Sequence, residues 1–302
     1  MASARVLLFG ASGFLGREVG NALNGDPRVA VVIQVGRSAP DEPGWARHDL
    51  IGGDPDRLAA VLRAQRPDVV VNCTGRLDGT TAELVSANVL ATANLLDAIR
   101  DVTPKARLVT LGSAGEYGVV PTGAAVTEDS PARPVAAYGV TKLAGTMLVQ
   151  SAVDSGLDAV VLRVFNPIGA GIAAGTVLGR AAASIRAAMA GGVEHIQLGP
   201  LGAYRDFVDV RDVATAISAA ALSAEQPPPV LNVGSGVAVA TRDTVAMLAD
   251  VAGFTGQVRE ADPAPARSGA VTWIAADLTR IERTLGWHPK YGLADSVREI
   301  WG

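Results

Sequence analysis

A glycine-rich turn near the amino terminus limits the folds open to this 302-residue chain more than any other feature. The turn, residues 10–16 with the sequence Gly-Ala-Ser-Gly-Phe-Leu-Gly, follows the apolar run 6–9 and precedes a helix-like stretch that ends near Asn24 and Gly25. Such a turn lets the backbone approach a ligand closely, and the N-terminus of the next helix attracts a pyrophosphate. Its place between a buried strand and a helix predicts dinucleotide binding.

The rest of the chain alternates apolar runs with helical stretches, which is typical of a doubly wound parallel sheet, the Rossmann architecture of the α/β class. Pro167 and Gly169 interrupt the chain after the apolar run 159–165, so we place a domain boundary there. The predicted dinucleotide-binding domain comprises residues 1–165, with 206–236 returning to it. A smaller, discontinuous C-terminal domain for the substrate comprises residues 166–205 and 237–302.

The end of the second predicted strand bears on the choice of cofactor. In NAD-selective proteins of this architecture an acidic residue there binds the ribose 2′-hydroxyl. This chain has Gln34 near that position, followed by Arg37 and Ser38. A missing acid, a cation and a hydroxyl favour NADP(H), with NAD as the alternative. Asp49, farther along, either caps a turn or contacts the adenine.

The predicted cofactor contacts lie in the glycine-rich turn, after the second strand and at the ends of later elements. They are Gly10, Ser12, Gly13, Phe14, Leu15, Gly16, Arg37, Ser38, Asp49, Leu50, Cys73, Thr74, Gly75, Asn88, Tyr138, Lys142 and Phe165.

Tyr138 and Lys142 lie four residues apart in the segment Tyr-Gly-Val-Thr-Lys. On a helix this spacing puts the phenol and the ammonium on one face, a turn apart. The cation favours the phenolate, so we expect Lys142 to lower the pKa of Tyr138 from its usual ~10. Ser113 follows the predicted strand 107–112, and ligands of such sheets lie beyond the carboxyl ends of the strands. Ser113 would polarise a carbonyl while Tyr138 donates the proton.

Composition argues against several other classes of function. The net charge is −4 and no block of Lys and Arg occurs, so we expect no nucleic-acid partner. Cys73 is the only cysteine and the three histidines are scattered, so we predict no intrachain disulfide and no metal site. The amino terminus does not resemble a signal peptide, and no apolar run reaches the ~18 residues of a membrane span. We therefore expect a cytoplasmic protein without a membrane partner.

Taken together, these motifs resemble those of the extended short-chain dehydrogenase/reductase family, of the NAD-dependent epimerase/dehydratase type. The three glycines of the turn match its cofactor motif, and Ser113, Tyr138 and Lys142 match its catalytic set. The resemblance covers nearly the whole chain through further segments at 128–131, 162–167, 205–210 and 285–287.

The resemblance implies a nucleotide-sugar substrate and roles for three further residues. Asn166 and Arg205 would contact the diphosphate region of the substrate, and Arg267 would be the second arginine there. The planar guanidinium of arginine suits phosphate. Around Arg267 the chain reads Arg-Ser-Gly-Ala, where the family usually has Arg-Pro-Gly-Asp, so the motif is incomplete.

Departures from the family pattern narrow the activity. In the 4,6-dehydratases an Asp-Glu pair follows the Ser or Thr and performs the elimination, whereas this chain has Ala114 and Gly115. Glu116 comes one position late, and we interpret it as a loop carboxylate. Segments 165–169 and 204–210 look most like reductases of nucleotide-activated 4-keto-6-deoxy sugars. We therefore predict an NADPH-dependent ketoreductase; the alternatives are an NAD-dependent nucleotide-sugar 4-epimerase and a non-catalytic dinucleotide sensor.

One predicted helix suggests how the protein assembles. The stretch 84–99 is apolar on more than one side, which indicates burial on both sides. This helix and the helix that starts at Tyr138 would pair with their copies across a two-fold axis, an arrangement that the resemblance also implies. We therefore expect a homodimer.

Overall fold

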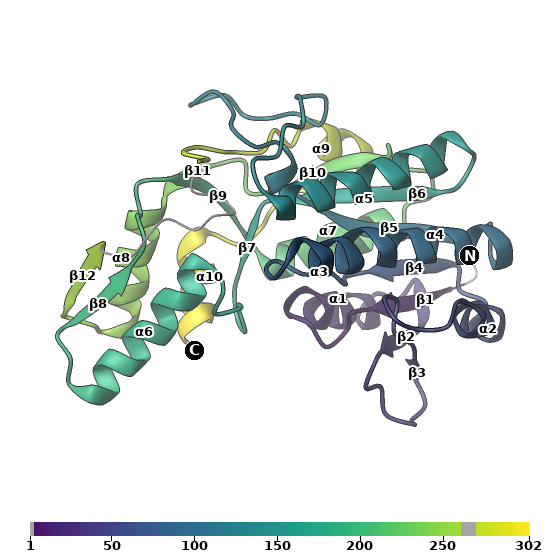
Figure 1. Cartoon of the computed structure of the whole chain (residues 1–302), viewed down its shortest axis with the longest axis horizontal. Coiled ribbons are helices and arrows are strands. Elements are labelled where there is room, and N and C mark those ends of the chain that lie inside the picture. Colours follow the sequence, from purple (N-terminus) through teal and green to yellow (C-terminus); the bar gives the residue numbers. More distant parts are fainter. Residues whose placement is uncertain (1–2, 261–269) are drawn as a thin grey trace.

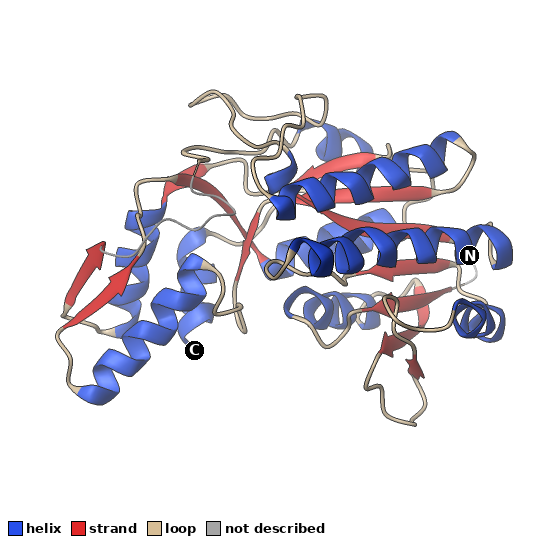
Figure 2. Cartoon of the chain, viewed as in Figure 1, coloured by secondary structure: helices blue, strands red, loops and turns tan. Residues whose placement is uncertain are grey.

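The computed structural model describes residues 3–260 and 270–302. Its main feature is a parallel sheet of seven strands in the order β10-β6-β5-β4-β1-β2-β3 (Figures 1 and 2), which confirms the predicted doubly wound fold. The strands are β1 (Ala4–Phe9), β2 (Val29–Gly36), β3 (Trp45–Arg47), β4 (Val69–Asn72), β5 (Arg107–Ser113), β6 (Ala159–Val164) and β10 (Val230–Val233).

Helices cover both faces of this sheet, so its inner strands are apolar on both sides. Within β1, Val6 and Leu8 pack into one hydrophobic cluster, and Leu7 and Phe9 pack into the other. The first cluster includes residues of α1 (Phe14–Asn24), α7 (Val210–Ala221) and α9 (Thr279–Leu285). The second includes residues of α2 (Pro55–Gln65), α4 (Ala91–Val102) and α5 (Ala137–Asp154). This alternation explains the unbroken apolar runs in the sequence.

The strand order fixes where a ligand can bind. The chain winds outward from β1 through β2 to β3, then crosses back to β4 on the other side of β1. In such sheets the crevice at this reversal, beyond the carboxyl ends of the strands, is the binding site. Phe9 at the end of β1 pairs with Asn72 at the end of β4. The glycine-rich turn that follows Phe9 therefore lies at the reversal.

The apolar helix predicted at residues 84–99 is longer and less regular than expected. It consists of α3 (Thr81–Val85), a π-helical turn (Ser86–Leu90) and α4, which continue one another. By length and composition alone, the span Thr81–Val102 could cross a membrane, and 44% of the apolar window is buried in the protein. Leu95, Leu96 and Ile99 of this span lie in the core beneath the sheet. Packing on the sheet thus accounts for one of its apolar sides.

A second lobe, on the left of Figure 1, is built around its own hydrophobic cluster. It contains α6 (Val177–Gly191), α8 (Thr241–Ala252), α10 (Leu293–Trp301) and the parallel pair β8 (His195–Leu198) and β12 (Gln257–Glu260). A small sheet of order β11-β9-β7 lies between this lobe and the large sheet; it comprises β7 (Asn166–Ile168), β9 (Tyr204–Asp209) and β11 (Ala238–Ala240). The chain returns to the large sheet with α7 and β10. Domain limits at 165 and 236 stay a prediction.

Candidate active site

The glycine-rich turn is shaped by contacts that leave no room for side chains. Gly10 has φ +76°, which favours glycine, and a Cβ there would lie 2.9 Å from the backbone of Cys73 and Thr74 at the end of β4. A Cβ at Gly16 would lie 2.0 Å from the Gly10 carbonyl oxygen. Gly13 is the N-cap of α1. The turn therefore brings bare backbone to the N-terminus of α1, which fits a dinucleotide pyrophosphate.

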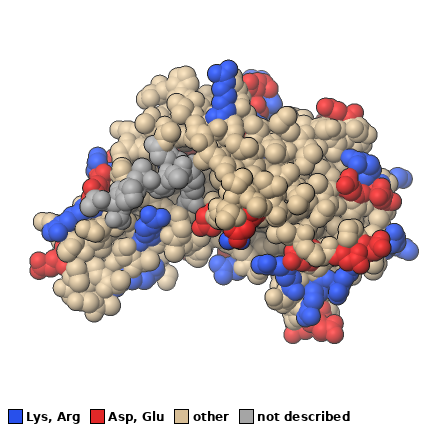
Figure 3. Space-filling view, viewed as in Figure 1, with Lys and Arg blue, Asp and Glu red and all other residues tan. Residues whose placement is uncertain are grey.

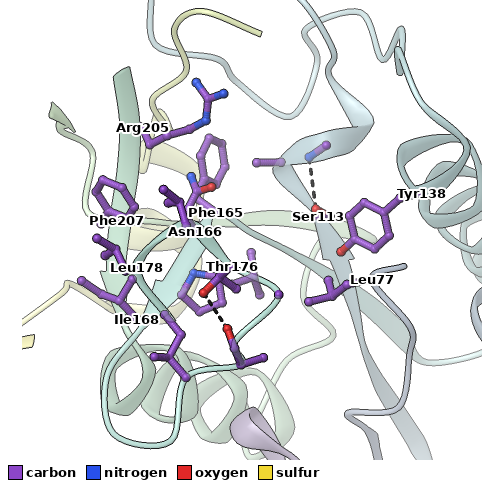
Figure 4. A pocket seen from close by; sticks show the side chains of 18 of the residues that line it. Leu77, Ser113, Tyr138, Phe165, Asn166, Ile168, Thr176, Leu178, Arg205 and Phe207 are labelled. Carbon is purple, nitrogen blue, oxygen red and sulfur yellow. Dashed lines mark hydrogen bonds between the residues drawn. The ribbon is translucent and has the colours of Figure 1, made fainter. Parts of the chain in front are cut away.

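A cleft of about 730 Å³ runs from this turn across the ends of the strands to the second lobe. Figure 4 shows Ser113, Tyr138 and Leu77 together on one side of it, and Asn166, Phe207 and Arg205 on the other. Most of the predicted site residues line the cleft: Gly13, Phe14, Leu15, Cys73, Thr74, Gly75, Asn88, Ser113, Tyr138, Lys142, Phe165, Asn166 and Arg205.

Ser113 and Tyr138 are brought together by β5 and α5. Ser113 is the last residue of β5 and caps the short 3₁₀ turn Ala114–Glu116, with its Oγ accepting a hydrogen bond from the Gly115 N–H at 3.1 Å. Tyr138 lies in the first turn of α5, half-buried, and its hydroxyl points toward Ser113 (Figure 4). A Cβ on Gly115 would lie 3.5 Å from the Tyr138 ring. A carbonyl oxygen placed between the two hydroxyls would be within reach of both donors.

Lys142 follows one turn later on α5 and is directed inward. Its Nζ donates to the carbonyl oxygen of Leu111 in β5. Burial lowers the pKa of this ammonium, and the negative charge of Glu116 opposes that effect, as a deprotonated Cys73 would. Burial in turn raises the pKa of Cys73 to about 12, so this thiol is neutral near pH 7. Lys142 therefore lines the cleft with a partly buried amine whose pKa burial lowers.

The π-helical turn has a structural role at this site. It places Asn88 so that its amide donates to the Arg76 carbonyl at 3.0 Å and to Thr141 Oγ1 at 3.1 Å, while its Oδ1 accepts from the Arg76 N–H at 2.9 Å. Asn88 thus ties the loop after β4 to α5. Single π-turns often occur at functional sites. The structure assigns Asn88 these contacts within the protein, and its predicted contact with the cofactor stays a prediction.

Seven of the predicted cofactor residues lie outside the lining of the cleft. They are Gly10, Ser12, Gly16, Arg37, Ser38, Asp49 and Leu50.

The residues expected near the ribose 2′-phosphate and the adenine of the cofactor lie after β2 and β3. Arg37 and Ser38 are both exposed, directly beyond the end of β2. Asp49 Oδ1 accepts from the Ile51 N–H at 3.0 Å, which is the turn-capping alternative. The Leu50 side chain is buried in the core that α2 and α4 share, so only its backbone could face a cofactor.

On the substrate side, Asn166 and Arg205 come from the small sheet. The amide of Asn166 donates to the Asp206 carbonyl at 2.9 Å, and Arg205 donates to the carbonyls of Tyr204 and Val271 at 2.9 and 2.6 Å. Burial lowers the pKa of the Arg205 guanidinium, because it disfavours the cation, and an anionic phosphate would offset that cost. Arg267 lies outside the described residues.

The structure corrects our interpretation of Glu116 as a loop carboxylate. Glu116 is fully buried, in a 3₁₀ turn, and forms an ion pair with Arg163 of β6 in which Oε2 and Nε are 2.7 Å apart. Its partners follow 30 and 47 residues later in the chain, so local sequence patterns could not reveal them. Leu77, Thr176 and Arg180 also line the cleft and were missed, because they lie in irregular stretches or at a helix start.

Comparisons with known proteins agree on the family. Residues 6–234 match the NAD dependent epimerase/dehydratase family. The chain is 41% identical over 307 residues to a dTDP-6-deoxy-L-talose 4-dehydrogenase (NAD(P)(+)) of Kitasatospora kifunensis, covering 99% of this chain and 95% of that protein. It is 30% identical to a GDP-6-deoxy-D-mannose reductase of Pseudomonas aeruginosa, covering 98% and 95%.

Solved structures give the same result. The structure titled RMD from Pseudomonas aeruginosa complexed with NADPH superposes with a TM-score of 0.81 at 27% identity, covering 99% of this chain and 96% of that one. MoeE5 in complex with UDP-glucose and NAD gives a TM-score of 0.82 at 28% identity, covering 98% and 96%. The second lobe is therefore shared along with the large sheet.

Proposed function

This chain belongs to the NAD dependent epimerase/dehydratase family, and from that premise we propose that it is an NADPH-dependent reductase of a keto group on a nucleotide-linked 6-deoxy sugar. That it is an oxidoreductase acting on nucleotide sugars follows from its relatives. The cofactor preference, the 4-keto position and the direction of the reaction are the proposal. The observation that carries it is the meeting of Ser113, Tyr138 and Lys142 in one cleft with the glycine-rich turn.

The chemistry follows from where these groups lie. When bound along the turn, NADPH supplies the hydride. Ser113 and Tyr138 donate hydrogen bonds to the carbonyl oxygen of the sugar, which makes its carbon more electrophilic. Tyr138 then gives its proton to that oxygen, so that the C=O becomes CH–OH. The cation of Lys142 on the same face of α5 stabilises the phenolate that remains until solvent returns the proton.

NADPH is proposed because of the charges beyond β2. Gln34 replaces an acid that would repel a 2′-phosphate, while Arg37 and Ser38 offer a charged and a neutral donor. Charge-assisted hydrogen bonds are the stronger kind. The relative from Kitasatospora is named for use of NAD(P)(+), and the Pseudomonas structure is complexed with NADPH. These names support NADPH as the preferred cofactor, with NAD as a weaker one.

The substrate class follows from the far side of the cleft. Arg205 and Asn166 lie across the cleft from Tyr138, where the diphosphate of a nucleotide sugar would extend from a hexose placed at Ser113 (Figure 4). The two relatives named above act on 6-deoxyhexoses linked to dTDP and GDP. We propose a 4-keto-6-deoxyhexose on such a nucleotide, with dTDP favoured by the higher identity.

One observation favours a 4-epimerase as the second candidate. A UDP-glucose 4-epimerase of Corynebacterium glutamicum is 30% identical, covering 98% of this chain and 94% of that protein. An epimerase oxidises and re-reduces one carbon, so it consumes no cofactor. Net consumption of NADPH therefore separates the two functions.

The test is oxidation of NADPH, followed by absorbance, with dTDP- and GDP-linked 4-keto-6-deoxyhexoses. We expect turnover by the wild type and a kcat lower by ~10²-fold or more in Tyr138→Phe, the usual scale of general acid catalysis, with cofactor affinity unchanged. Tyr291→Phe is the matched control, because Tyr291 stacks on Arg211 and does not line the cleft. Activity of Tyr138→Phe within a few-fold of this control would rule out Tyr138 as the acid.

A further inference from the structure

Glu116 joins three elements of the candidate site. Its Oε1 accepts the Ser113 N–H at 2.8 Å at the end of β5. Its Oε2 accepts from Thr146 Oγ1 of α5 at 3.0 Å and from Arg163 Nε of β6 at 2.7 Å. The side chain has 0% exposure, and neither the proposed reaction nor the cofactor site uses it. Removing one partner of a buried ion pair leaves a buried charge unpaired, so the Glu116 carboxylate ties these three elements together.

The contact with Thr146 aligns α5 on the end of β5. Tyr138, Lys142 and Thr146 are spaced i, i+4 and i+8, so they share one face of the helix. Thr146 binds Glu116, and Lys142 binds the Leu111 carbonyl, which lies two residues before Ser113 in β5. These two contacts hold α5 at the two turns that follow the turn carrying Tyr138.

The backbone around the Glu116 carboxylate is packed so closely that it leaves no room for a side chain at Gly112 or Gly139. A Cβ on Gly112 would lie 2.6 Å from Glu116 Oε1, and a Cβ on Gly139 would lie 2.3 Å from the Gly115 carbonyl oxygen. Both glycines therefore allow β5, the 3₁₀ turn and α5 to approach one another around the Glu116 side chain. A shift of the carboxylate would move the backbone of Ser113.

Glu116 also bears on the charge of Lys142. Burial lowers the pKa of Lys142, whereas Glu116 and Cys73 raise it. The titratable groups whose charge acts on Lys142 are Glu116 from the 3₁₀ turn and Cys73 from the end of β4, and Tyr138 precedes it by one turn on α5. Cys73 is protonated near pH 7, since its pKa is raised to about 12. Glu116 is left as the carboxylate that favours the cationic form of Lys142.

We propose that Glu116 is a positioning residue, which holds the Ser113 end of β5 against the face of α5 that carries Tyr138, Lys142 and Thr146, with its carboxylate close to Lys142. Arg163 behind it anchors the carboxylate and donates to the Tyr117 hydroxyl at 3.2 Å. The catalytic part of this inference rests on the proposed function, whereas the effect on Lys142 does not depend on any substrate.

The direct test measures the titration of each lysine side chain, which is feasible because the chain has only Lys105, Lys142 and Lys290. Protein labelled with ¹³C-lysine should give three side-chain signals in an NMR spectrum. The signal that is absent from the spectrum of Lys142→Arg belongs to Lys142. In Glu116→Gln we expect Lys142 to titrate at lower pH than in the wild type, because an anion that raised its pKa is gone. The exposed Lys105 and Lys290 serve as internal references and should not change.

A matched control lies at the other end of β5. Arg107 and Asp158 form a second arginine–carboxylate pair at 3.0 Å, away from the cleft. Asp158→Asn should lower the melting temperature without moving the Lys142 titration. Because Glu116→Gln leaves Arg163 without its carboxylate, the double variant Glu116→Gln/Arg163→Met removes both charges and serves if the single variant folds poorly.

Kinetics complete the test. We expect Glu116→Gln to lower kcat at least about tenfold, since small displacements of catalytic groups are costly, and to leave KM and NADPH affinity within about threefold. The alkaline limb of the kcat profile should move to lower pH. A Lys142 titration equal to that of wild type, or a kcat equal to that of Asp158→Asn, would overturn the inference. Absence of any wild-type turnover would count against the proposed function alone, since the lysine titration needs no substrate.

Discussion

At the residue scale, we propose that the choice between NADPH and NADH depends on one exposed cation, Arg37. Arg37 and the neighbouring Ser38 lie just beyond the carboxyl end of β2, the strand next to the glycine-rich turn. A phosphate on the ribose would meet both donors there, whereas a free ribose hydroxyl would gain little from a cation. Arg37 should therefore act on the difference between the two cofactors more than on binding of the dinucleotide itself.

We predict that the wild type binds NADPH more tightly than NADH by roughly 1–3 kcal/mol, about ten- to a hundred-fold, the scale of hydrogen bonds to charged groups. Arg37→Ala should remove most of this preference and leave NADH binding little changed. Fluorescence titration of both cofactors measures it. Arg63→Ala, an exposed arginine in the last turn of α2, is the control and should change neither affinity. An equal loss for NADH and NADPH in Arg37→Ala would contradict the assignment.

Local spacing explains which site residues the sequence could predict. Tyr138 and Lys142 are four residues apart on one helix, and Ser113 ends a strand whose apolar run is obvious, so all three emerge from short-range patterns. Glu116 could not be recognised, because its role depends on Arg163, 47 residues away. The side-chain burial of Leu50 likewise depends on helices that pack on it from later in the chain.

At the element scale, the close packing of α1 on the end of β1 shapes the glycine-rich turn. Gly16 lies in the first turn of α1, and any side chain there would collide with the Gly10 carbonyl oxygen. The collision is with backbone, so no rotamer change can relieve it.

We expect Gly16→Ala to displace α1, to lower the melting temperature by several degrees and to weaken NADPH binding at least tenfold, as overpacking of about 1–3 kcal/mol implies. Gly25→Ala is the control, since its Cβ would have no neighbour nearer than 3.5 Å and its φ is −82°. Calorimetry and cofactor titration of both variants measure the effect. Equal melting temperatures and NADPH affinities in the two variants would contradict the prediction, because the turn would then have room for a side chain at Gly16.

The elements that were predicted well are those with long apolar runs. The strands of the large sheet are buried on both faces, so each one reads as a continuous hydrophobic stretch. The small sheets were not predicted, because β7 and β11 have three residues each and lie among Pro and Gly. The π-turn was also missed, since the contacts of Asn88 within it are to Arg76 and Thr141, 12 and 53 residues away in the sequence.

At the scale of the whole molecule, one apolar face is left uncovered by the part of the chain that the structure describes. Leu90, Val140 and Met147 are 48%, 51% and 60% exposed on the outer side of the π-turn and α5. Figure 3 shows the surface over α4 and α5 largely free of charged side chains, with charges gathered at its margins. Exposed apolar patches of this kind mark interaction surfaces. We propose that a second copy of the chain covers it across a two-fold axis.

We expect the wild type to be a dimer by light scattering at micromolar concentration, and Met147→Asp to be a monomer, because a carboxylate would be buried in the interface. Met189→Asp is the matched control, since Met189 is 46% exposed on α6 of the second lobe. A monomeric wild type, or dimerisation lost equally in both variants, would exclude this interface.

The central claim is that the protein carries out a net reduction of a nucleotide-linked keto sugar, with NADPH as the hydride source and Tyr138 as the acid. NADPH carrying deuterium at both C4 positions of the nicotinamide tests it in one experiment with a dTDP-4-keto-6-deoxyhexose in excess. Mass and NMR spectra of the sugar should show one deuterium at C4, with one NADPH oxidised for each sugar reduced. A sugar that carries no deuterium, with no net oxidation of NADPH, would contradict this account. Inversion at C4 of the matching dTDP-6-deoxyhexose with a C4 hydroxyl, with no cofactor consumed, would identify the protein as an epimerase.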